Sequence, residues 1–258
     1  MNTRRPAEIN TAIAHPARVY DYLLGGKDNW PADREVAERM IQVIPYLGDE
    51  MLANRAFLRR TVRYAARQGV TQFLDIGTGI PTAGPTHETA HAVAPAARVV
   101  YVDNDASVLA HARALLVNDD RTYAVRADAR EPATILENPQ VRSRLDLTRP
   151  VALMFVFLLH FITDEEIDGL LQRYTRDLAP GSMLIISHGL DTPTGRAATA
   201  PYKATAPLVP RTRAAIAELF AGWDLTAPGL VPIHEWHPDP DDGSPKSRHA
   251  VGGVAVKP

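Results

Sequence analysis

Two acidic residues and a pair of glycines are the part of this sequence best suited to binding chemistry. The apolar run at residues 72–76 contains Asp75 near its end and leads directly into Gly77, Thr78 and Gly79. Residues without Cβ let the backbone turn sharply and let a ligand lie against it. A strand, a glycine turn and a helix in this order form the nucleotide-binding junction of α/β sheets. We therefore expect a nucleotide-like ligand here.

A second acid narrows the choice of ligand. Asp103 ends the next apolar run, residues 98–103. A carboxylate beside the turn would repel the pyrophosphate of a dinucleotide but would attract an ammonium or a sulfonium. S-adenosylmethionine carries both cations, and its ribose diol can donate two hydrogen bonds to an acid on the second strand. Thr82 also replaces the third glycine of the dinucleotide fingerprint, so the sequence favours S-adenosylmethionine over NAD.

Alternating strands and helices would bring both acids to one edge of a sheet. The apolar patterns predict strands at 72–75, 98–103, 123–128, 151–159, 183–188, 223–233 and 248–257. Helices are predicted between them, at about 81–93, 106–117, 164–178 and 211–220. Pro81 suits the first turn of the first of these helices, and Thr163 with Glu166 forms a capping box for the third. We expect a doubly wound, mostly parallel α/β sheet with its ligand at the carboxyl ends of the strands.

The first third of the chain has a different pattern. Apolar residues at helical spacing predict helices at 18–24, 33–44 and 51–65, and the first of them stops at Gly25 and Gly26. Residues 1 to about 15 show no periodicity and are expected to form an arm. The expected organisation is an N-terminal arm and helical cap or lid at 1–70 and a ligand-binding domain at 71–258.

The chain resembles a known enzyme class at these positions. Asp75-Ile76-Gly77-Thr78-Gly79 followed by Asp103 resembles the class I S-adenosylmethionine-dependent methyltransferases. Residues 16–29, Pro-Ala-Arg-Val-Tyr-Asp-Tyr-Leu-Leu-Gly-Gly-Lys-Asp-Asn, together with 78–82, are similar to a bacterial family of these enzymes whose substrates are largely unassigned. The resemblance covers nearly the whole chain. It implies a Rossmann-like fold of seven strands with the last one reversed, S-adenosylmethionine as cofactor, and methyl transfer to an unspecified acceptor.

The resemblance also implies roles for individual residues near the cofactor. Asp75 would face the methionine ammonium and Asp103 the ribose hydroxyls. Asp128 with Ala129 would receive the adenine amino group. Asp103 could instead cap the following helix, although Asn104 or Asp105 suits that role better. The complete set of expected cofactor contacts is Asp75, Gly77, Thr78, Gly79, Pro81, Asp103, Asn104, Asp128, Ala129 and Phe157.

A further group of residues could act on the acceptor. His160 follows the fourth predicted strand and could take a proton from a hydroxyl or an amine, since an ordinary histidine pKa of about 6.5 suits neutral pH. The alternative, a hydrogen-bonded structural histidine, stays equally open. His188 is a second candidate. Tyr20, Tyr22 and Lys27 could form a lid over the cofactor carboxylate or the acceptor, or could belong to a turn packed on the domain.

Composition excludes several classes of protein. The net charge of −2 provides no field to attract nucleic acid or an anionic membrane, and the absence of cysteine rules out thiolate chemistry. The first residues lead into no apolar signal segment, and the longest apolar run, 151–161, is shorter than the roughly 20 residues that span a bilayer. Residues 234–242 contain metal-capable side chains, but their prolines indicate an acidic loop, so no metal is expected. We expect a cytoplasmic protein with a small-molecule partner and leave its oligomeric state open.

Three functions account for these features. The first is a methyltransferase that uses S-adenosylmethionine and acts at oxygen or nitrogen of a small or medium-sized molecule. It needs no general base, because correct positioning of an activated methyl group can supply much of the rate. The second is a sensor or regulator that binds S-adenosylmethionine or a nucleoside without turnover. The third is a nicotinamide-dependent oxidoreductase.

Overall fold

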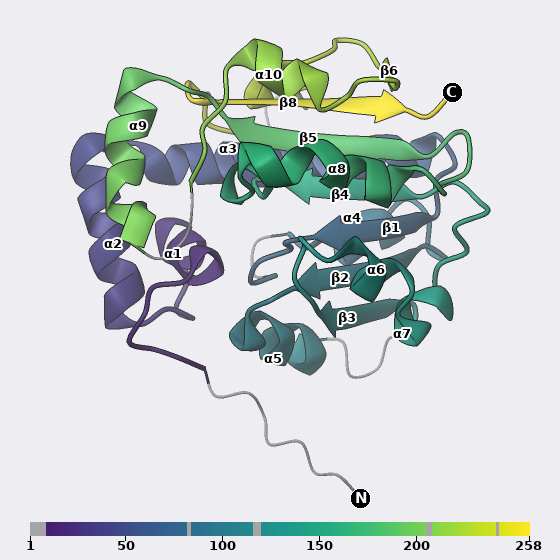
Figure 1. The fold of residues 1–258 in the computed structure, drawn as a ribbon, viewed down its shortest axis with the longest axis horizontal. Coiled ribbons are helices and arrows are strands. Elements are labelled where there is room, and N and C mark those ends of the chain that lie inside the picture. The colour runs from purple at the N-terminus through teal and green to yellow at the C-terminus, as the bar shows by residue number, and fades with distance from the viewer. Residues whose placement is uncertain (1–8, 82–83, 116–119, 205–207, 241–242) are drawn as a thin grey trace, which may run out of the picture.

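A single mixed β-sheet organises the chain (Figure 1). The computed structural model describes residues 9–81, 84–115, 120–204, 208–240 and 243–258. Within these residues the sheet has eight strands in the order β3-β2-β1-β4-β5-β8-β6, and β7 also pairs with β8. The strands are β1 (Gln72–Ile76), β2 (Arg98–Asp103), β3 (Thr122–Arg126), β4 (Ala152–Val156), β5 (Met183–Gly189), β6 (Asp224–Leu225), β7 (Val231–Pro232) and β8 (Ala250–Val256).

The strand directions confirm the doubly wound fold that the sequence predicts. Strands β1 to β5 are parallel, and β8 runs antiparallel to β5. The order reverses at β1, which pairs with β2 on one side and with β4 on the other. A topological switch point of this kind is where open α/β sheets bind their ligands. Asp75 and Asp103 therefore come to the same edge at neighbouring strands.

Helices cover both faces of the sheet and one of its ends (Figure 1). The helices α6 and α8 lie in front of the sheet in this view, α3 runs behind it, and α1, α2 and α9 lie beyond the carboxyl ends of the parallel strands. The α-helices are α1 (Pro16–Leu23), α2 (Pro31–Val43), α3 (Leu47–Arg67), α4 (Thr86–His91), α5 (Ala106–Leu115), α6 (Pro132–Leu136), α7 (Pro139–Arg142), α8 (Asp164–Thr175), α9 (Pro193–Thr199) and α10 (Arg213–Glu218). Short 3-10 helices are η1 (Leu159–Phe161), η2 (Ala200–Ala204) and η3 (Ile233–Glu235). No helix in the described part of the chain combines the length and the apolar character that crossing a bilayer requires.

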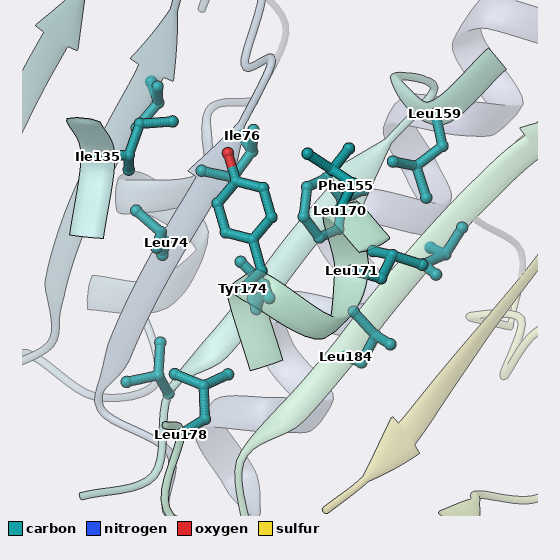
Figure 2. Packing of buried hydrophobic residues seen from close by; sticks show 14 of the residues in the cluster. Leu74, Ile76, Ile135, Phe155, Leu159, Leu170, Leu171, Tyr174, Leu178 and Leu184 are labelled. Carbon is teal, nitrogen blue, oxygen red and sulfur yellow. The ribbon is translucent and has the colours of Figure 1, made fainter. Parts of the chain in front are cut away.

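Apolar side chains fill the space on each face of the sheet. On one face, Leu74 and Phe155 of the strands pack with Leu170 and Tyr174 of α8 (Figure 2). The rings of Phe155 and Tyr174 meet edge to face, with centroids 5.1 Å apart, and the Tyr174 hydroxyl donates to the carbonyl of Ala129 at 2.8 Å. This arrangement buries the ring and still satisfies its polar tip. It also links α8 to the loop after β3.

The opposite face is covered mainly by α3. Phe57 and Val62 of this helix are fully buried against the strands, and Phe57 meets Trp236 with ring centroids 5.8 Å apart. A third apolar cluster joins α1, α2, α9 and η2 to the first turns of α3. The helices that the sequence predicts as a cap thus share a core with α9.

Three predicted elements differ most from those in the structure. The helix expected at about 81–93 begins only at Thr86, because Gly84 has a φ of 68° and Pro85 precedes the helix, and residues 82 and 83 lie outside the described residues. The strand expected at 151–159 ends at Val156, since Phe157 has a φ of 54°. The strand expected at 223–233 is divided into β6 and β7. The capping box of α8 is confirmed, with the amide of Thr163 donating to the Glu166 carboxylate at 3.0 Å.

Candidate functional site

A cavity of about 510 Å³ lies where the carboxyl ends of the parallel strands meet the capping helices. Its lining includes Asp75 and Asp103 from the sheet and Met40 and Leu47 from the cap. A concave space with an apolar lining and a few convergent polar groups is typical of small-molecule sites. The predicted site residues that line it are Tyr20, Asp75, Gly77, Thr78, Gly79, Asp103, Asn104, Asp128, Ala129, Phe157 and His160.

Asp75 is buried at the bottom of the glycine turn. Its Oδ2 atom accepts hydrogen bonds from the Thr86 hydroxyl at 2.7 Å and from the Thr78 hydroxyl at 3.3 Å. Its Oδ1 atom accepts none from the described residues. Burial raises the pKa of this carboxyl, and the two hydroxyl groups and the nearby Arg55 oppose that rise. A buried carboxylate with one uncommitted oxygen suits a cationic ligand.

Asp103 is held in place by backbone amides. Oδ2 accepts from the amide of Gly79 at 3.0 Å, and Oδ1 accepts from the amide of Asp105 at 2.9 Å. Burial raises the pKa of the Asp103 carboxyl, while these two amides lower it. Each oxygen keeps a second lone pair, so the group can accept one further hydrogen bond per oxygen. Two neighbouring hydroxyl groups match that capacity.

The two glycines of the turn are required for different reasons. Gly77 has a φ of 70°, and a Cβ there would lie 2.4 Å from Cδ1 of Leu158. Gly79 has a φ of 63°, and a Cβ there would lie 3.7 Å from Nη2 of Arg55. Both conformations are ones that residues with side chains rarely adopt. Glycine thus sets the path of the turn around the Asp103 carboxylate.

Arg55, which was not among the predicted site residues, completes this end of the cavity. The side chain is 6% exposed, its guanidinium carbon lies 5.1 Å from the Tyr20 ring centroid, and its Nη2 donates to the carbonyl of Ile80 at 3.4 Å. Its Nε is buried without a hydrogen-bond partner. A signal did exist: Arg55 lies on the apolar stripe of its helix, between Met51 and Leu58. A buried guanidinium with a free donor suits an anion.

A polar chain joins the cap to the strand edge beside Phe157. The Tyr20 hydroxyl donates to the carbonyl of Met51 at 3.1 Å and accepts from Asn54 Nδ2 at 3.0 Å. The Ser187 hydroxyl donates to Asn54 Oδ1 at 2.7 Å. The Tyr20 and Phe157 rings meet edge to face at 6.4 Å. Because Phe157 holds a positive φ, the turn after β4 carries the kind of strain that concentrates at functional sites.

His160 lies on the wall of the cavity and is 8% exposed. Its Nδ1 is enclosed by protein without a hydrogen-bond partner, which leaves Nε2 as the nitrogen that a molecule in the cavity can reach. Burial, with smaller contributions from His188 and Arg211, holds the pKa of this imidazole well below its ordinary value. The ring is therefore neutral at pH 7 and can accept a proton transiently.

His188 does not take part in the cavity wall that the structure describes. Its Nδ1 lies 2.7 Å from the carbonyl of Gly189, and its Nε2 lies 3.0 Å from Nη1 of Arg211. Arg211 also donates to the carbonyls of Leu159 and Ile162, both at 2.9 Å. Burial lowers the pKa of His188 to about 4. Both nitrogens thus have partners, and Arg211 connects His188 of β5 to the loop after β4.

The three residues predicted to form a lid lie in different environments. Tyr20 lines the cavity, whereas Tyr22 donates to Glu38 at 3.1 Å and Lys27 is exposed. Neither of the latter two, nor Pro81, lines the cavity in the described part of the chain.

The loop around Lys27 is organised by a buried acid. The Asp21 carboxylate accepts from the Asp28 amide at 2.8 Å and from Asn29 Nδ2 at 2.9 Å. A Cβ on Gly26 would lie 2.1 Å from the same carboxylate, which explains the glycine. The polar residues of this motif therefore build a turn.

The start of α1 is tied to the loop that follows Asp103. His15 Nδ1 lies 3.0 Å from Asp105 Oδ2, and His15 Nε2 lies 3.2 Å from Asn104 Oδ1. The Arg18 guanidinium lies 3.3 Å from Asp33 and 3.6 Å from Asp105, and all three of these side chains are buried. These contacts hold α1 and α2 over the edge of the sheet. The cap is thereby positioned relative to the acids.

Asp128 lies at the far side of the same edge and is partly exposed. Its Oδ1 accepts from the Arg130 amide at 2.9 Å and lies 3.5 Å from the Arg130 Nε. In the loop expected to bind no metal, His234 and Glu235 approach each other at 3.7 Å, while residues 241 and 242 lie outside the described residues. No three His, Cys, Asp or Glu side chains gather as a metal site in the part of the chain that the structure describes.

Comparison with known proteins points to one family. A model of the S-adenosyl methyltransferase family matches residues 2–258. A structure from Thermobifida fusca YX, provisionally described as a methyltransferase, is 39% identical, has a TM-score of 0.91, and aligns over 99% of each chain. A DUF574 family protein from Streptomyces avermitilis MA-4680 is 43% identical, has a TM-score of 0.91, and aligns over 97% of this chain and 100% of its own. No functionally curated sequence matches the chain.

A more distant structure shows the fold alone. Human N-acetylserotonin methyltransferase in complex with S-adenosylmethionine is 16% identical, with a TM-score of 0.52, and aligns over 87% of this chain and 57% of its own. This likeness confirms the Rossmann-like arrangement of the sheet.

Proposed function

The chain belongs to the S-adenosyl methyltransferase family and uses S-adenosylmethionine as its cofactor, and we propose that it methylates an oxygen or nitrogen atom of a small or medium-sized molecule. The observation that carries this proposal is the cavity that joins Asp75 and Asp103 to an apolar space under the cap. A cofactor and a second molecule can meet there beneath the cap, and binding both would displace water from the site. Displacement of water would strengthen the electrostatic interactions within the site.

The residues at the strand edge match the charges of the cofactor. In this proposal Asp75 Oδ1 accepts from the ammonium, the Arg55 guanidinium pairs with the carboxylate, and Asp103 accepts from both ribose hydroxyls. Asp75 and Arg55 are a buried pair of opposite charge beside one glycine turn, which suits a zwitterion. Asp128 with Ala129 would contact the adenine, and Phe157 would lie between the two halves of the cavity.

His160 is proposed to act as the base for the acceptor. When bound, the cofactor supplies a methyl group activated by its sulfonium, and the electron pair of the broken bond remains on sulfur. His160 Nε2 would take the proton that the acceptor loses, because the residue lines the cavity, its Nδ1 is enclosed by protein, and the ring is neutral. Its contribution to the rate would be that of a general base, about 10²-fold to 10⁴-fold.

Binding measurements test the cofactor site without knowledge of the acceptor. Calorimetry with S-adenosylhomocysteine and with 5′-methylthioadenosine, which lacks the amino acid group, separates the two ends of the site. We expect Asp103→Ala to weaken both ligands about a hundredfold or more, since two charge-assisted hydrogen bonds are lost and each contributes about 1.5–3 kcal/mol. We expect Arg55→Met to weaken S-adenosylhomocysteine alone.

Two results would contradict the assignment. Unchanged binding by the Asp103→Ala protein would remove the ribose role, and equal losses for both ligands in Arg55→Met would remove the carboxylate role. Failure of the unaltered protein to methylate any member of a broad panel of hydroxyl and amine compounds would oppose the proposed acceptor chemistry. Arg39→Met, on the exposed surface of α2, is the matched control for loss of an arginine.

A further inference from the structure

The end of the cavity away from the acids is built from apolar side chains. They come from α1, α2 and the residue that follows it, α3, α9, η2 and the segment before α10, so the chain brings them together from distant positions. These residues are Val19, Leu23, Met40, Ile44, Leu47, Met51, Ala198, Tyr202 and Leu208. A ligand with an apolar body gains free energy by leaving water for such a surface.

Polar groups at this end already have partners. The Glu50 carboxylate accepts from the Ser247 hydroxyl and from the Arg248 amide, both at 2.6 Å. His249 Nε2 lies 2.9 Å from the Tyr46 hydroxyl. The Asn54 amide is held in the polar chain described above. Glu50, His249 and Asn54 thus have hydrogen-bond partners. The imidazole of His160 makes no hydrogen bond to a described residue.

Fixed positive charge is confined to the other end of the cavity. Arg55 and Arg130 are the arginines or lysines that line the cavity in the described residues. Arg55 lies beside Gly79, and Arg130 contacts Asp128, so both belong to the cofactor end. A phosphate or carboxylate at the apolar end would therefore lose its hydration without gaining a counter-charge, and Glu50 would repel it. An ammonium would also lose its hydration, and the Glu50 carboxylate, which already accepts one hydrogen bond on each oxygen, would replace only part of it.

The apolar lining and the distribution of charge restrict the chemical class of the acceptor. Building on the proposed function, we infer that the acceptor is an uncharged, mostly apolar molecule that presents one hydroxyl group, as a phenol or an alcohol, to His160. The hydroxyl donates to His160 Nε2 and passes its proton there as the oxygen forms its bond to the methyl carbon. The apolar body occupies the space between Met40, Leu47 and Met51.

Matched ligands that differ only in charge test this inference by binding. The protein, saturated with S-adenosylhomocysteine, is titrated with two neutral phenols of different shape, 1-naphthol and 4-phenylphenol. It is then titrated with their phosphate esters and with 1-naphthylmethylamine, which is a cation at pH 7. We expect at least one phenol to bind tenfold or more tightly than each charged counterpart. The inference is overturned if neither phenol binds, or if a charged counterpart binds equally well or better.

A pair of neighbouring substitutions locates the binding. Met51 is 8% exposed and lines the cavity, whereas Leu52 is 45% exposed on the outer side of the same helix. We expect Met51→Lys to weaken phenol binding at least tenfold and to strengthen binding of the phosphate esters, and Leu52→Lys to change neither. Equal effects from both substitutions would contradict the location. The comparison of ligands on the unaltered protein decides the inference even if Met51→Lys does not fold.

The cofactor titration distinguishes failure of this inference from failure of the proposed function. If S-adenosylhomocysteine binds and the phenols do not, the inference on the acceptor is wrong and the cofactor site stands. If S-adenosylhomocysteine itself does not bind, the assignment of the strand edge to the cofactor is wrong. The His160→Gln protein adds a further readout, because loss of the ring nitrogen should weaken phenol binding without changing S-adenosylhomocysteine binding.

Discussion

At the scale of single residues, the glycine turn shows how little space the site leaves. Gly77 combines a positive φ with a neighbour, Leu158, that occupies the place of a side chain. We expect Gly77→Ala to lower the free energy of unfolding by about 1–3 kcal/mol and to weaken cofactor binding. Gly25→Ala is the matched control, since Gly25 has a φ of 76° with open space around it and so reports backbone strain alone.

Denaturant unfolding and calorimetry measure these two effects. If Gly77→Ala and Gly25→Ala lose the same stability and Gly77→Ala binds cofactor normally, the contact with Leu158 has no importance. The double variant Gly77→Ala with Leu158→Ala should regain part of the loss, because removing the leucine side chain frees the space. A double variant less stable than Gly77→Ala would contradict the steric explanation.

The buried imidazole of His160 leads to a prediction on pH. Because burial holds its pKa well below the ordinary value, the ring should stay neutral as the pH falls through 6.5. Titration followed by the NMR signal of its ring carbon, assigned by comparison with His160→Gln, measures this directly. A midpoint at or above 6.5 would show that the ring is not buried as described, and His160 would then be partly charged at neutral pH.

The residues that sequence reasoning placed well are those that a strand end positions. Asp75, Asp103 and Asp128 follow strands of one parallel sheet, so their common edge could be predicted from apolar runs alone. The positions of the Lys27 and His188 side chains could not be predicted from strand ends. Lys27 is exposed on the turn that Asp21 organises, and His188 contacts Arg211, which lies in a later segment of the chain. Contacts between distant segments leave no local pattern in the sequence.

At the scale of elements, the buried charges of α1 and α2 hold the cap in position. Removing one member of a buried ion pair leaves the other uncompensated, at a cost of about 3–5 kcal/mol. We therefore expect Arg18→Met to lower stability by about that amount and to increase hydrogen exchange in α1 more than in the sheet. Arg39→Met, which removes an exposed pair with Glu35, should cost less than about 1 kcal/mol.

Chemical unfolding and hydrogen exchange resolved by peptide provide the two measurements. Similar losses from both arginine substitutions would mean that the Arg18 contacts with Asp33 and Asp105 contribute no more than a surface pair. Uniform exchange across the chain would mean that the cap and the sheet open together.

Periodicity predicted most elements but not where each begins and ends. The apolar stripes of α2, α3 and α8 follow helical spacing, so their existence could be read directly. The start of α4 depends on the conformation of Gly84 and Pro85, and the end of β4 depends on the strained Phe157. Such boundaries are decided by φ values that the surrounding structure imposes.

At the scale of the whole molecule, buried histidines should make the fold sensitive to acid. His188 has a pKa of about 4 in the folded protein and about 6.5 when unfolded, so the unfolded chain binds more protons between these values. Stability is therefore lost as the pH falls from 6.5 towards 4, by about 3 kcal/mol from this group at about 1.4 kcal/mol for each pKa unit. His160 acts in the same direction, while the raised pKa values of Asp75 and Asp103 act in the opposite direction.

Comparison with a variant isolates the contribution of His188. His188→Gln removes the titrating group, so the stability difference between the unaltered protein and the variant should shrink as the pH falls from 6.5 towards 4. Denaturant unfolding at half-unit pH steps measures this difference. A difference that stays constant over this range would mean that His188 has an ordinary pKa in the folded protein.

The cavity is the feature that the sequence could not predict. Its walls come from α1, α2, α3, α9 and the strand edge together, so its existence depends on how the cap sits on the sheet. The sequence pattern predicts a cap from residues 1–70, and in the structure α9 and η2, from residues 193–204, are part of the same apolar cluster. An insertion rich in Thr, Ala and Pro has no periodicity from which such packing could be read.

The helix α3 contributes both to the cavity and to the hydrophobic core. Met51 and Arg55 line the cavity, while Phe57 packs against the backbone of β8 at Gly252. A change on α3 that adapted the protein to another molecule would disturb the hydrophobic interior within one helical turn. Among the described residues, the buried side chains of α2 and α9 belong to the apolar cluster of the cap and not to the clusters on the sheet faces. Diversity among relatives that accept different molecules should therefore accumulate on α2 and α9, while α3 stays nearly constant.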